Sequence, residues 1–127
     1  MSVDLTVAIP TYNGESRIFK VLERLQNQIG TEHFSWEIIA IDNNSNDNTA
    51  QVVKEYQANW NLPYPLKYCF EPKQGLALAR QRAINESSGT YIAFLDDDNL
   101  PDDNWVAQAY KFGQEYPKAG AYSGQIH

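Results

Sequence analysis

Short apolar runs alternate with helical patterns along the whole chain, and this alternation constrains the possible fold more than any other feature. Runs rich in β-branched and aromatic residues predict buried strands at 5–9, 36–42, 66–70 and 91–95, and a further strand is predicted to begin within 119–126. Between these runs, apolar residues recur at helical spacing, most clearly at Ile18, Val21, Leu22, Leu25 and Ile29. Further helices are expected at 49–60, at 75–86 and from Pro101 onward. The pattern predicts an α/β fold with a mostly parallel sheet and helices on both faces.

Length and charge narrow the class of protein. The chain has 127 residues, enough for one domain with a sizeable core. Its net charge of −6 disfavours a nucleic-acid partner, because neutralising phosphates requires clustered Lys and Arg. The single cysteine, Cys69, excludes an internal disulfide and fits a reducing compartment. No apolar run approaches the ~20 residues that a membrane-spanning helix needs, and no secretory signal is visible, so a cytoplasmic location is expected.

Polar clusters follow three of the predicted strands, at 10–13, 42–47 and 96–99. In an open parallel sheet, ligands bind outside the carboxyl ends of the strands. These three loops are therefore predicted to converge on one crevice, which becomes the candidate functional site.

The third loop begins with three consecutive carboxylates, Asp96, Asp97 and Asp98. Adjacent carboxylates repel one another, so a bound cation would offset their charge, and oxygen ligands favour Mg²⁺ or Mn²⁺. Side chains alternate in direction along a strand end, so Asp96 and Asp98 are expected on one side and Asp97 on the other. A solvated acidic turn before the next helix explains the same residues equally well, and the triplet alone does not decide between the two.

The other two loops also permit both a structural and a binding interpretation. The loop 42–47 resembles a calcium-binding EF-hand loop, but Asp47 stands where that loop requires Gly, so this interpretation fails. Its short polar side chains suit either a turn or the recognition of a base edge and ribose hydroxyls. Tyr12 either packs against the core or offers a flat surface to a nucleobase. The glycine fingerprint of dinucleotide-binding folds and the phosphate-loop motif do not occur in the sequence.

Four blocks of sequence, taken together, resemble the family 2 glycosyltransferases, which have the Rossmann-like GT-A fold. The blocks are 7–14, 38–45 continuing to Thr49, 74–80, and 89–98. Each block is modest alone, but their order and spacing are specific, and they cover nearly the whole chain. The resemblance implies that residues 1–127 are the donor-binding part of an enzyme of polysaccharide or glycoconjugate synthesis. That enzyme would transfer a sugar from a nucleotide-diphosphate sugar to the hydroxyl of a saccharide or lipid-linked acceptor.

The resemblance also implies roles for individual residues. Asp96 and Asp98 would hold the divalent metal, with Asp98 as its direct ligand, while Asp97 would contact the ribose. Arg80 would lie near the diphosphate or pair with a loop carboxylate, and both roles stay open. The implied donor-binding residues are Pro10, Thr11, Tyr12, Asn13, Asp42, Asn43, Asn44, Gly75, Arg80 and Asp97.

Two departures from the family pattern bear on this prediction. Many members carry an Asp where this chain has Asn43, and that carboxylate can accept a hydrogen bond from N3–H of uracil or thymine. An amide at this position leaves UDP, dTDP and GDP open as donors. The chain also has about half the usual length of a catalytic domain, so it is expected to be a truncated domain that lacks the acceptor-binding half and the catalytic base of inverting members. Alone it is expected to be inactive.

Two other functions are weighed against the transferase. A sugar-phosphate nucleotidyltransferase would need a basic, glycine-rich loop after the first strand, and no Lys or Arg precedes Arg17 there. A non-catalytic nucleotide-sugar-binding or assembly module stays open. A homo-oligomer, and a full-length enzyme held peripherally at the inner face of the membrane, are compatible with the sequence.

Overall fold

A computed structural model describes residues 3–115 and 121–123. Its centre is a five-stranded sheet in which every pair of neighbouring strands is parallel, in the order β3-β2-β1-β4-β5. The strands are β1 (Val3–Thr11), β2 (Trp36–Asp42), β3 (Leu66–Phe70), β4 (Gly89–Phe94) and β5 (Ala121–Ser123). The predicted parallel α/β sheet is confirmed. The strand expected within 119–126 is present as β5, and the rest of that range lies outside the described residues.

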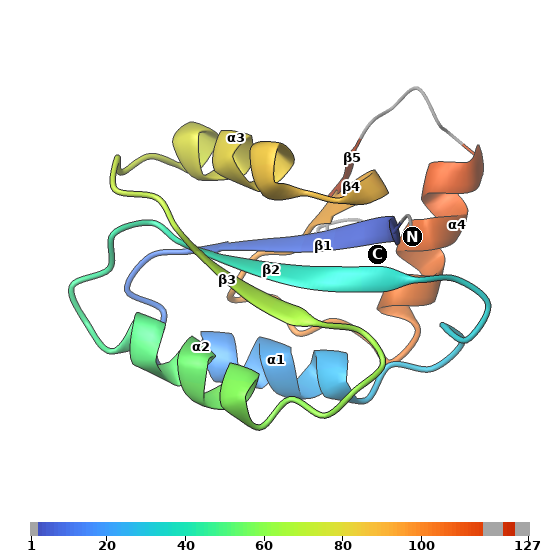
Figure 1. The fold of residues 1–127 in the computed structure, drawn as a ribbon, viewed down its shortest axis with the longest axis horizontal. Helices are drawn as coiled ribbons and strands as arrows, with labels where there is room; N and C mark the ends of the chain where they lie inside the picture. Colours follow the sequence, from blue (N-terminus) through green and yellow to red (C-terminus); the bar gives the residue numbers. More distant parts are fainter. Residues whose placement is uncertain (1–2, 116–120, 124–127) are drawn as a thin grey trace.

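Helices cover both faces of this sheet, as the alternation predicts (Figure 1). The helices are α1 (Ile18–Gln26), α2 (Thr49–Ala58), α3 (Leu76–Glu86) and α4 (Trp105–Glu115). The larger core joins α1, α2 and α4 to one face of the sheet. A smaller core joins α3 to the other face through Ala79, Ala83, Ile39 and Ile41. Two alanines on one side of α3 let this helix lie close against the sheet.

The prediction for the first helix is right in its core and wrong at its end. Ile18, Val21, Leu22 and Leu25 are fully buried in the larger core. The helix stops at Gln26, however, and Ile29 is 56% exposed. Ile29 follows the helix end, where the backbone turns toward Gly30, so helical spacing no longer determines its direction. The last helix, predicted from Pro101 onward, begins only at Trp105, after a turn at Asp103 and Asn104.

The register of the sheet brings the three polar loops to one edge. Thr11 pairs with Asp42 across β1 and β2, and Ala8 pairs with Phe94 across β1 and β4. The amide of Leu95 then donates to the carbonyl of Ala8 at 2.9 Å, which carries the chain directly into the acidic triplet. Among the described residues, the helices are too short and too polar to cross a membrane.

Candidate functional site

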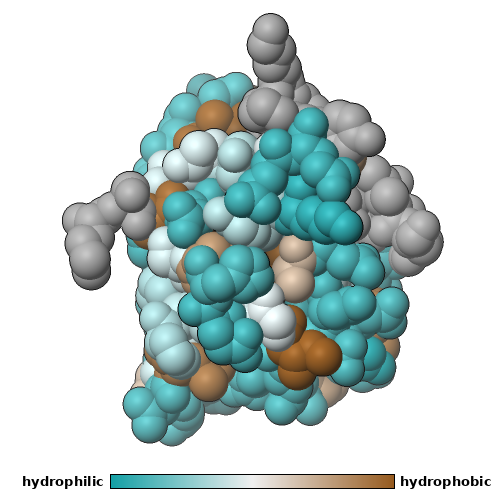
Figure 2. Space-filling view, turned by 90° about the vertical axis from the view of Figure 1, so that its right-hand side faces the viewer, coloured by the Kyte–Doolittle hydropathy of each residue, from teal (hydrophilic) through white to brown (hydrophobic). Residues whose placement is uncertain are grey.

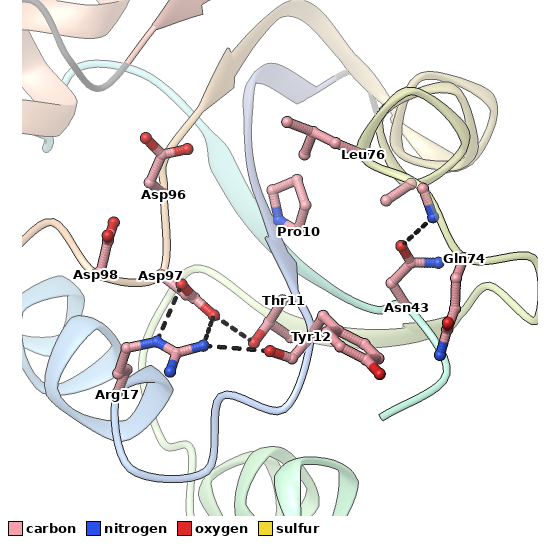
Figure 3. Close-up of a pocket in the computed structure, with 12 residues that line it drawn as sticks. Pro10, Thr11, Tyr12, Arg17, Asn43, Gln74, Leu76, Asp96, Asp97 and Asp98 are labelled. Carbon is pink, nitrogen blue, oxygen red and sulfur yellow. Dashed lines mark hydrogen bonds and ion pairs between the residues drawn. The ribbon is translucent and has the colours of Figure 1, made fainter. Parts of the chain in front are cut away.

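A cavity of about 450 Å³ opens at the carboxyl ends of the strands, where the sequence predicts a crevice (Figure 3). It runs from an aromatic and amide end to an acidic end, and β1 passes between the two. The described residues that line it are Pro10, Thr11, Tyr12, Arg17, Asn43, Gln74, Gly75, Leu76, Ala79, Asp96, Asp97 and Asp98.

Tyr12 and Leu76 give the first end its apolar surface. Tyr12 follows β1 and is 44% exposed, and Leu76 is exposed at the start of α3. Large apolar side chains are ordinarily drawn into the core, so two of them facing one cavity offer a surface for a flat apolar group. Gln74 adds an amide on the same side of the cavity (Figure 3).

Asn43 is the most constrained polar residue of this end. It is only 6% exposed, and its Nδ2 donates to the carbonyl oxygens of Glu71 at 3.2 Å and Lys73 at 2.8 Å. Its Oδ1 accepts a hydrogen bond from the backbone amide of Gly75 at 2.9 Å. Both amide hydrogens and one lone pair of the carbonyl oxygen are therefore used to hold the loop 71–75.

Gly75 enables this arrangement at the start of α3. Its φ of 144° lies in the region that side chains disfavour, and it allows the amide to face Asn43 while the next residue begins the helix. The loop is also held by Asn44, whose Nδ2 donates to the carbonyl of Pro72 at 3.2 Å. The wall that carries Gln74 and Leu76 is thus held in place by the two asparagines that directly follow β2.

Asp97 occupies the acidic end and is held from two sides. Thr11 Oγ1 donates to its Oδ2 at 2.7 Å. Arg17 donates from Nε to Oδ1 at 3.4 Å and from Nη2 to Oδ2 at 3.3 Å. The hydrogen bond and the negative charge of Asp97 raise the pKa of Arg17 above its already high ordinary value. Gly14 permits this packing, because a Cβ there would lie 2.7 Å from Asp97 Oδ2.

Asp96 and Asp98 bring carboxylate oxygens to the same end of the cavity, where Asp98 is exposed. Among the described residues, no group of three or more His, Cys, Asp or Glu side chains is arranged to hold a metal ion. A complete metal cage is therefore not built from protein groups alone. Mg²⁺ and Mn²⁺ sites that leave positions for phosphate oxygens and water need only one or two carboxylates, and this donor set fits such a cation.

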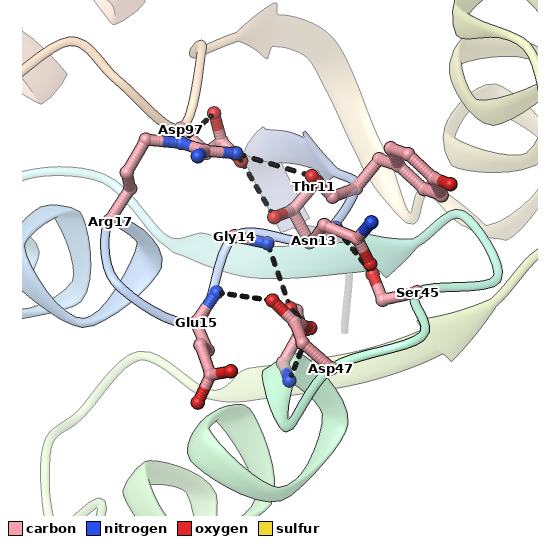
Figure 4. A network of polar contacts seen from close by, with 10 residues as sticks. Thr11, Asn13, Gly14, Glu15, Arg17, Ser45, Asp47 and Asp97 are labelled. Carbon is pink, nitrogen blue, oxygen red and sulfur yellow. Dashed lines mark hydrogen bonds and ion pairs between the residues drawn. The ribbon is translucent and has the colours of Figure 1, made fainter.

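Hydrogen bonds between loops hold the floor of the site in place (Figure 4). The amide of Asn13 donates to Ser45 Oγ at 2.9 Å, and the amide of Gly14 donates to Thr49 Oγ1 at 2.9 Å. Asn13 Oδ1 in turn accepts a hydrogen bond from the amide of Asn46 at 2.7 Å. The loop after β1 is therefore fastened to the loop after β2.

The structure brings most of the predicted site residues together. Eight line the cavity: Pro10, Thr11, Tyr12, Asn43, Gly75, Asp96, Asp97 and Asp98. Four predicted donor-binding residues are not among the described lining residues: Asn13, Asp42, Asn44 and Arg80. Their contact with a donor stays a prediction.

The structure gives each of these four a local partner. Asp42 is buried and accepts hydrogen bonds from Tyr68 Oη at 2.7 Å and from the amide of Ser45 at 3.0 Å. Burial, followed by the hydrogen bond to Asp42, raises the pKa of Tyr68. Arg80 lies with its guanidinium carbon 5.7 Å from the centre of the Phe94 ring.

The sequence interpretation did not assign Arg17, Gln74, Leu76 or Ala79 to the site. Gln74, Leu76 and Ala79 lie in a block that resembles the family, so that block carried the signal that could have identified them. Arg17 lies outside every block, and no sequence signal pointed to it.

Comparison with known proteins identifies the family. The sequence profile described as "Glycosyl transferase family 2" matches residues 6–127. The chain belongs to this family. Glycosyltransferase GlyA of Streptococcus pneumoniae is 29% identical over 112 residues, which are 88% of this chain and 15% of that protein. This chain therefore spans only a small part of the length of that relative.

Solved structures show the same fold. The mannosyltransferase PcManGT from Pyrobaculum calidifontis, in complex with GDP-Man and Mn²⁺, matches with a TM-score of 0.77 and 26% identity. S. aureus TarS 1-349 in complex with UDP matches with a TM-score of 0.75 and 26% identity. These matches cover 89% and 91% of this chain, respectively, and 33% of each solved chain. The chain has the GT-A fold of the family.

Proposed function

We propose that the cavity binds a nucleotide-diphosphate sugar, and that the chain is the donor-binding part of a glycosyltransferase. The observation that carries this proposal is that one cavity combines an aromatic, amide-lined end with an acidic end. An exposed aromatic ring and amides lie at one end, and carboxylates lie at the other. A nucleoside diphosphate has the matching polarity, with a flat base at one end and a cation-binding diphosphate at the other.

Each end of the cavity has an assigned role in this proposal. Tyr12 stacks on the base, and Thr11 and Gly75 lie along the base and ribose. Asp96 and Asp98 would hold Mn²⁺ or Mg²⁺, which would offset the negative charge of the departing diphosphate. Asn13, Asp42, Asn44 and Arg80 would then support this site from outside the cavity.

The proposed reaction is a displacement at the anomeric carbon. The hydroxyl oxygen of a saccharide or lipid-linked acceptor forms the new bond, the bond to the diphosphate breaks, and a base takes the hydroxyl proton. A single displacement inverts the anomeric configuration. We assign no catalytic base, because the assigned residues position the donor and its leaving group. The pathway would be polysaccharide or glycoconjugate synthesis. One relative, from Campylobacter jejuni, is named as a GalNAc(5)-diNAcBac-PP-undecaprenol beta-1,3-glucosyltransferase.

A non-catalytic nucleotide-sugar-binding module is the second candidate, because the same cavity would serve it. The two differ in turnover, not in donor binding. A nucleotidyltransferase is disfavoured, because Arg17 is the one basic side chain among the described residues that line the cavity and a triphosphate would require more.

Calorimetric titration tests the binding step. UDP, dTDP and GDP are titrated with and without Mn²⁺ into the wild-type chain, Asp98→Asn and Asp103→Asn. We expect metal-dependent binding of one nucleotide, weakened about tenfold in Asp98→Asn, which corresponds to the loss of one charge-assisted contact. Asp103 is exposed and is not among the lining residues, so Asp103→Asn controls for the same change of net charge. Absence of binding for all three nucleotides would contradict the proposal.

A further inference from the structure

Arg17 lies at the boundary between the acidic end of the cavity and a second, smaller cavity of about 180 Å³. The smaller cavity is lined by Ser16, Arg17, Lys20, Asp97, Asp98 and Leu100. Arg17 is partly exposed, so its guanidinium remains accessible from both sides while it contacts Asp97. No sequence motif marks this residue, and the family comparison assigns it nothing.

We infer that Arg17 is a positioning residue that keeps Asp97 out of the coordination of the cation and couples cation binding to diphosphate binding. This inference rests on the proposed function. It divides the acidic triplet into two parts: Asp97 pairs with Arg17, while Asp96 and Asp98 bind the cation.

The first argument is the geometry of Asp97. Both of its carboxylate oxygens accept hydrogen bonds from Arg17, and Oδ2 also accepts one from Thr11. Its side chain is 15% exposed, whereas Asp98 is an exposed residue. A cation that recruited Asp97 would have to displace a guanidinium from it, and Arg17 therefore biases the cation toward the other two carboxylates.

The second argument is that Arg17 connects the two ends of the cavity. Its Nη2 donates to the backbone carbonyl of Tyr12 at 3.2 Å as well as to Asp97 (Figure 3). The chain segment that directs the Tyr12 ring is thereby fastened to the acidic loop. Loss of the guanidinium would release both ends at once.

The third argument is charge. The triplet presents three carboxylates, and Arg17 contributes the one positive charge among the described lining residues of the larger cavity. This positive charge repels a bare cation and attracts a diphosphate. Arg17 therefore weakens the binding of the cation alone and strengthens the binding of the cation together with the nucleotide. Such coupling is reciprocal, so each ligand promotes the other.

The test measures both affinities in Arg17→Gln, Arg17→Lys and Lys20→Gln. Free Mn²⁺ is followed by electron paramagnetic resonance, first with protein alone and then with the nucleotide selected by calorimetry. For Arg17→Gln we expect Mn²⁺ alone to bind about fivefold tighter and the nucleotide with Mn²⁺ to bind about tenfold weaker. Opposite signs cannot arise from a general loosening of the site, which would weaken both.

Two variants serve as matched controls. Lys20→Gln removes an equal charge from the smaller cavity and leaves the bonds between Arg17 and Asp97 in place, so both affinities should change by less than about twofold. Arg17→Lys keeps the charge but loses the fork of donors, so Mn²⁺ alone should bind with an affinity between those of the wild type and Arg17→Gln, while the nucleotide binds more weakly than to the wild type. Arg17→Lys also gives a result if Arg17→Gln does not fold.

The outcomes separate the inference from the proposed function. If Mn²⁺ alone binds Arg17→Gln no more tightly than it binds the wild type, the inference is wrong, whatever the nucleotide does. If the wild type binds none of the nucleotides, the proposed function fails, and the Mn²⁺ measurement still decides whether Arg17 restrains the cation. If Lys20→Gln changed both affinities as much as Arg17→Gln does, the effect of Arg17 would be that of any nearby positive charge, and the inference would also be wrong.

Discussion

Each end of the sheet has a carboxylate that accepts a hydrogen bond from a threonine and pairs with a basic side chain, but the surroundings of the two carboxylates differ. At the amino ends of the strands, Glu37 accepts a hydrogen bond from Thr6 Oγ1 at 2.7 Å and pairs with Lys67 at 2.6 Å. At the carboxyl ends, Asp97 accepts a hydrogen bond from Thr11 Oγ1 at 2.7 Å and pairs with Arg17 at 3.3 Å. Both threonines belong to β1, so a single strand presents one carboxylate partner toward each end of the molecule.

The surroundings differ in enclosure. The amide of Ser88 also donates to Glu37 at 2.9 Å, so the turn between α3 and β4 covers this carboxylate, and its side chain is only 1% exposed. Asp97 is 15% exposed and borders two cavities. The side of the molecule with the amino end of β1 is mostly hydrophilic, with apolar residues in small separate groups (Figure 2).

The comparison shows that a carboxylate, a threonine and a cation do not by themselves identify a site. Glu37 contacts Thr6, Lys67 and the amide of Ser88, and these contacts join β1, β2, β3 and the segment before β4. Around Asp97, the carboxylates of Asp96 and Asp98 line a cavity that is large enough for a ligand. Stability should therefore depend most on the amino end, and binding should depend most on the carboxyl end.

The largest effect is expected from Glu37→Ala. It removes the acceptor of Thr6 and of the Ser88 amide inside the protein, and the unfolding free energy should fall by about 3 kcal/mol. Urea unfolding measures this loss. Nucleotide binding by the protein that remains folded should be unchanged, because Glu37 lies at the opposite end of the strands from the cavity.

Glu115→Ala is the control for this substitution. Glu115 pairs with Lys111 at 3.9 Å on the surface of α4, and such exposed pairs contribute less than about 1 kcal/mol. A comparable loss of stability in the two variants would remove the distinction between a buried network and a surface ion pair.

A smaller effect is expected from Asn43→Asp, which acts on the other wall of the site. A carboxylate cannot donate to the carbonyls of Glu71 and Lys73, so the loop 71–75 loses two hydrogen bonds and gains a repulsion, at a cost of about 2 kcal/mol. Nucleotide affinity should fall for every base alike, because the loop that carries Gln74 and Leu76 moves. Calorimetry with the three nucleotides checks this.

Asn44→Asp provides a matched control. Asn44 is the exposed neighbour with φ of 60°, a conformation that Asp also tolerates, and its side chain donates one hydrogen bond to the loop. Asn44→Asp should lose less stability than Asn43→Asp and should weaken nucleotide binding less. If Asn43→Asp instead strengthened the binding of a uracil or thymine nucleotide, Asn43 would be a reader of the base and not a support for the loop.

The sequence was sufficient for the features that depend on local pattern. Buried strands and the acidic triplet could be placed because apolar runs and strand ends are visible one element at a time. The buried network around Glu37 could not be recognised from the sequence. Glu37 stands in an apolar strand, and its partner Lys67 comes from a later strand. The same reason applies to Arg17, whose direction depends on a loop 80 residues away.

Asn43 shows a second limit of the sequence. Its position after β2 was evident, and a role in reading the base followed from the family pattern. The structure shows the amide directed at the loop 71–75, an arrangement that depends on the path of a segment about 30 residues later. Ile29 shows a third limit, because the apolar spacing continues past the point where the helix ends.

The smallest effect is expected from acid. Burial alone would raise the pKa of Glu37, but Lys67, the Ser88 amide and Thr6 outweigh it and hold this pKa below its ordinary value of 4.5. A lowered pKa in the folded state means that the stabilisation is present above the ordinary value and is lost as the pH falls through the folded value. Unfolding free energy should therefore change little between about pH 7 and pH 5 on account of Glu37, and should fall below about pH 4.5.

Glu37→Gln isolates this contribution, because an amide does not titrate. Its unfolding free energy should be lower at neutral pH but should decline less steeply in acid, so the two curves converge as the pH falls. Some acid sensitivity should persist, since bonds to Thr49 outweigh burial and lower the pKa of Asp47 as well. Urea unfolding of both proteins at a series of pH values provides the measurement. Parallel curves would mean that Glu37 has the same pKa folded and unfolded, and that the enclosure at the amino end stabilises the fold through packing and not through a charged carboxylate.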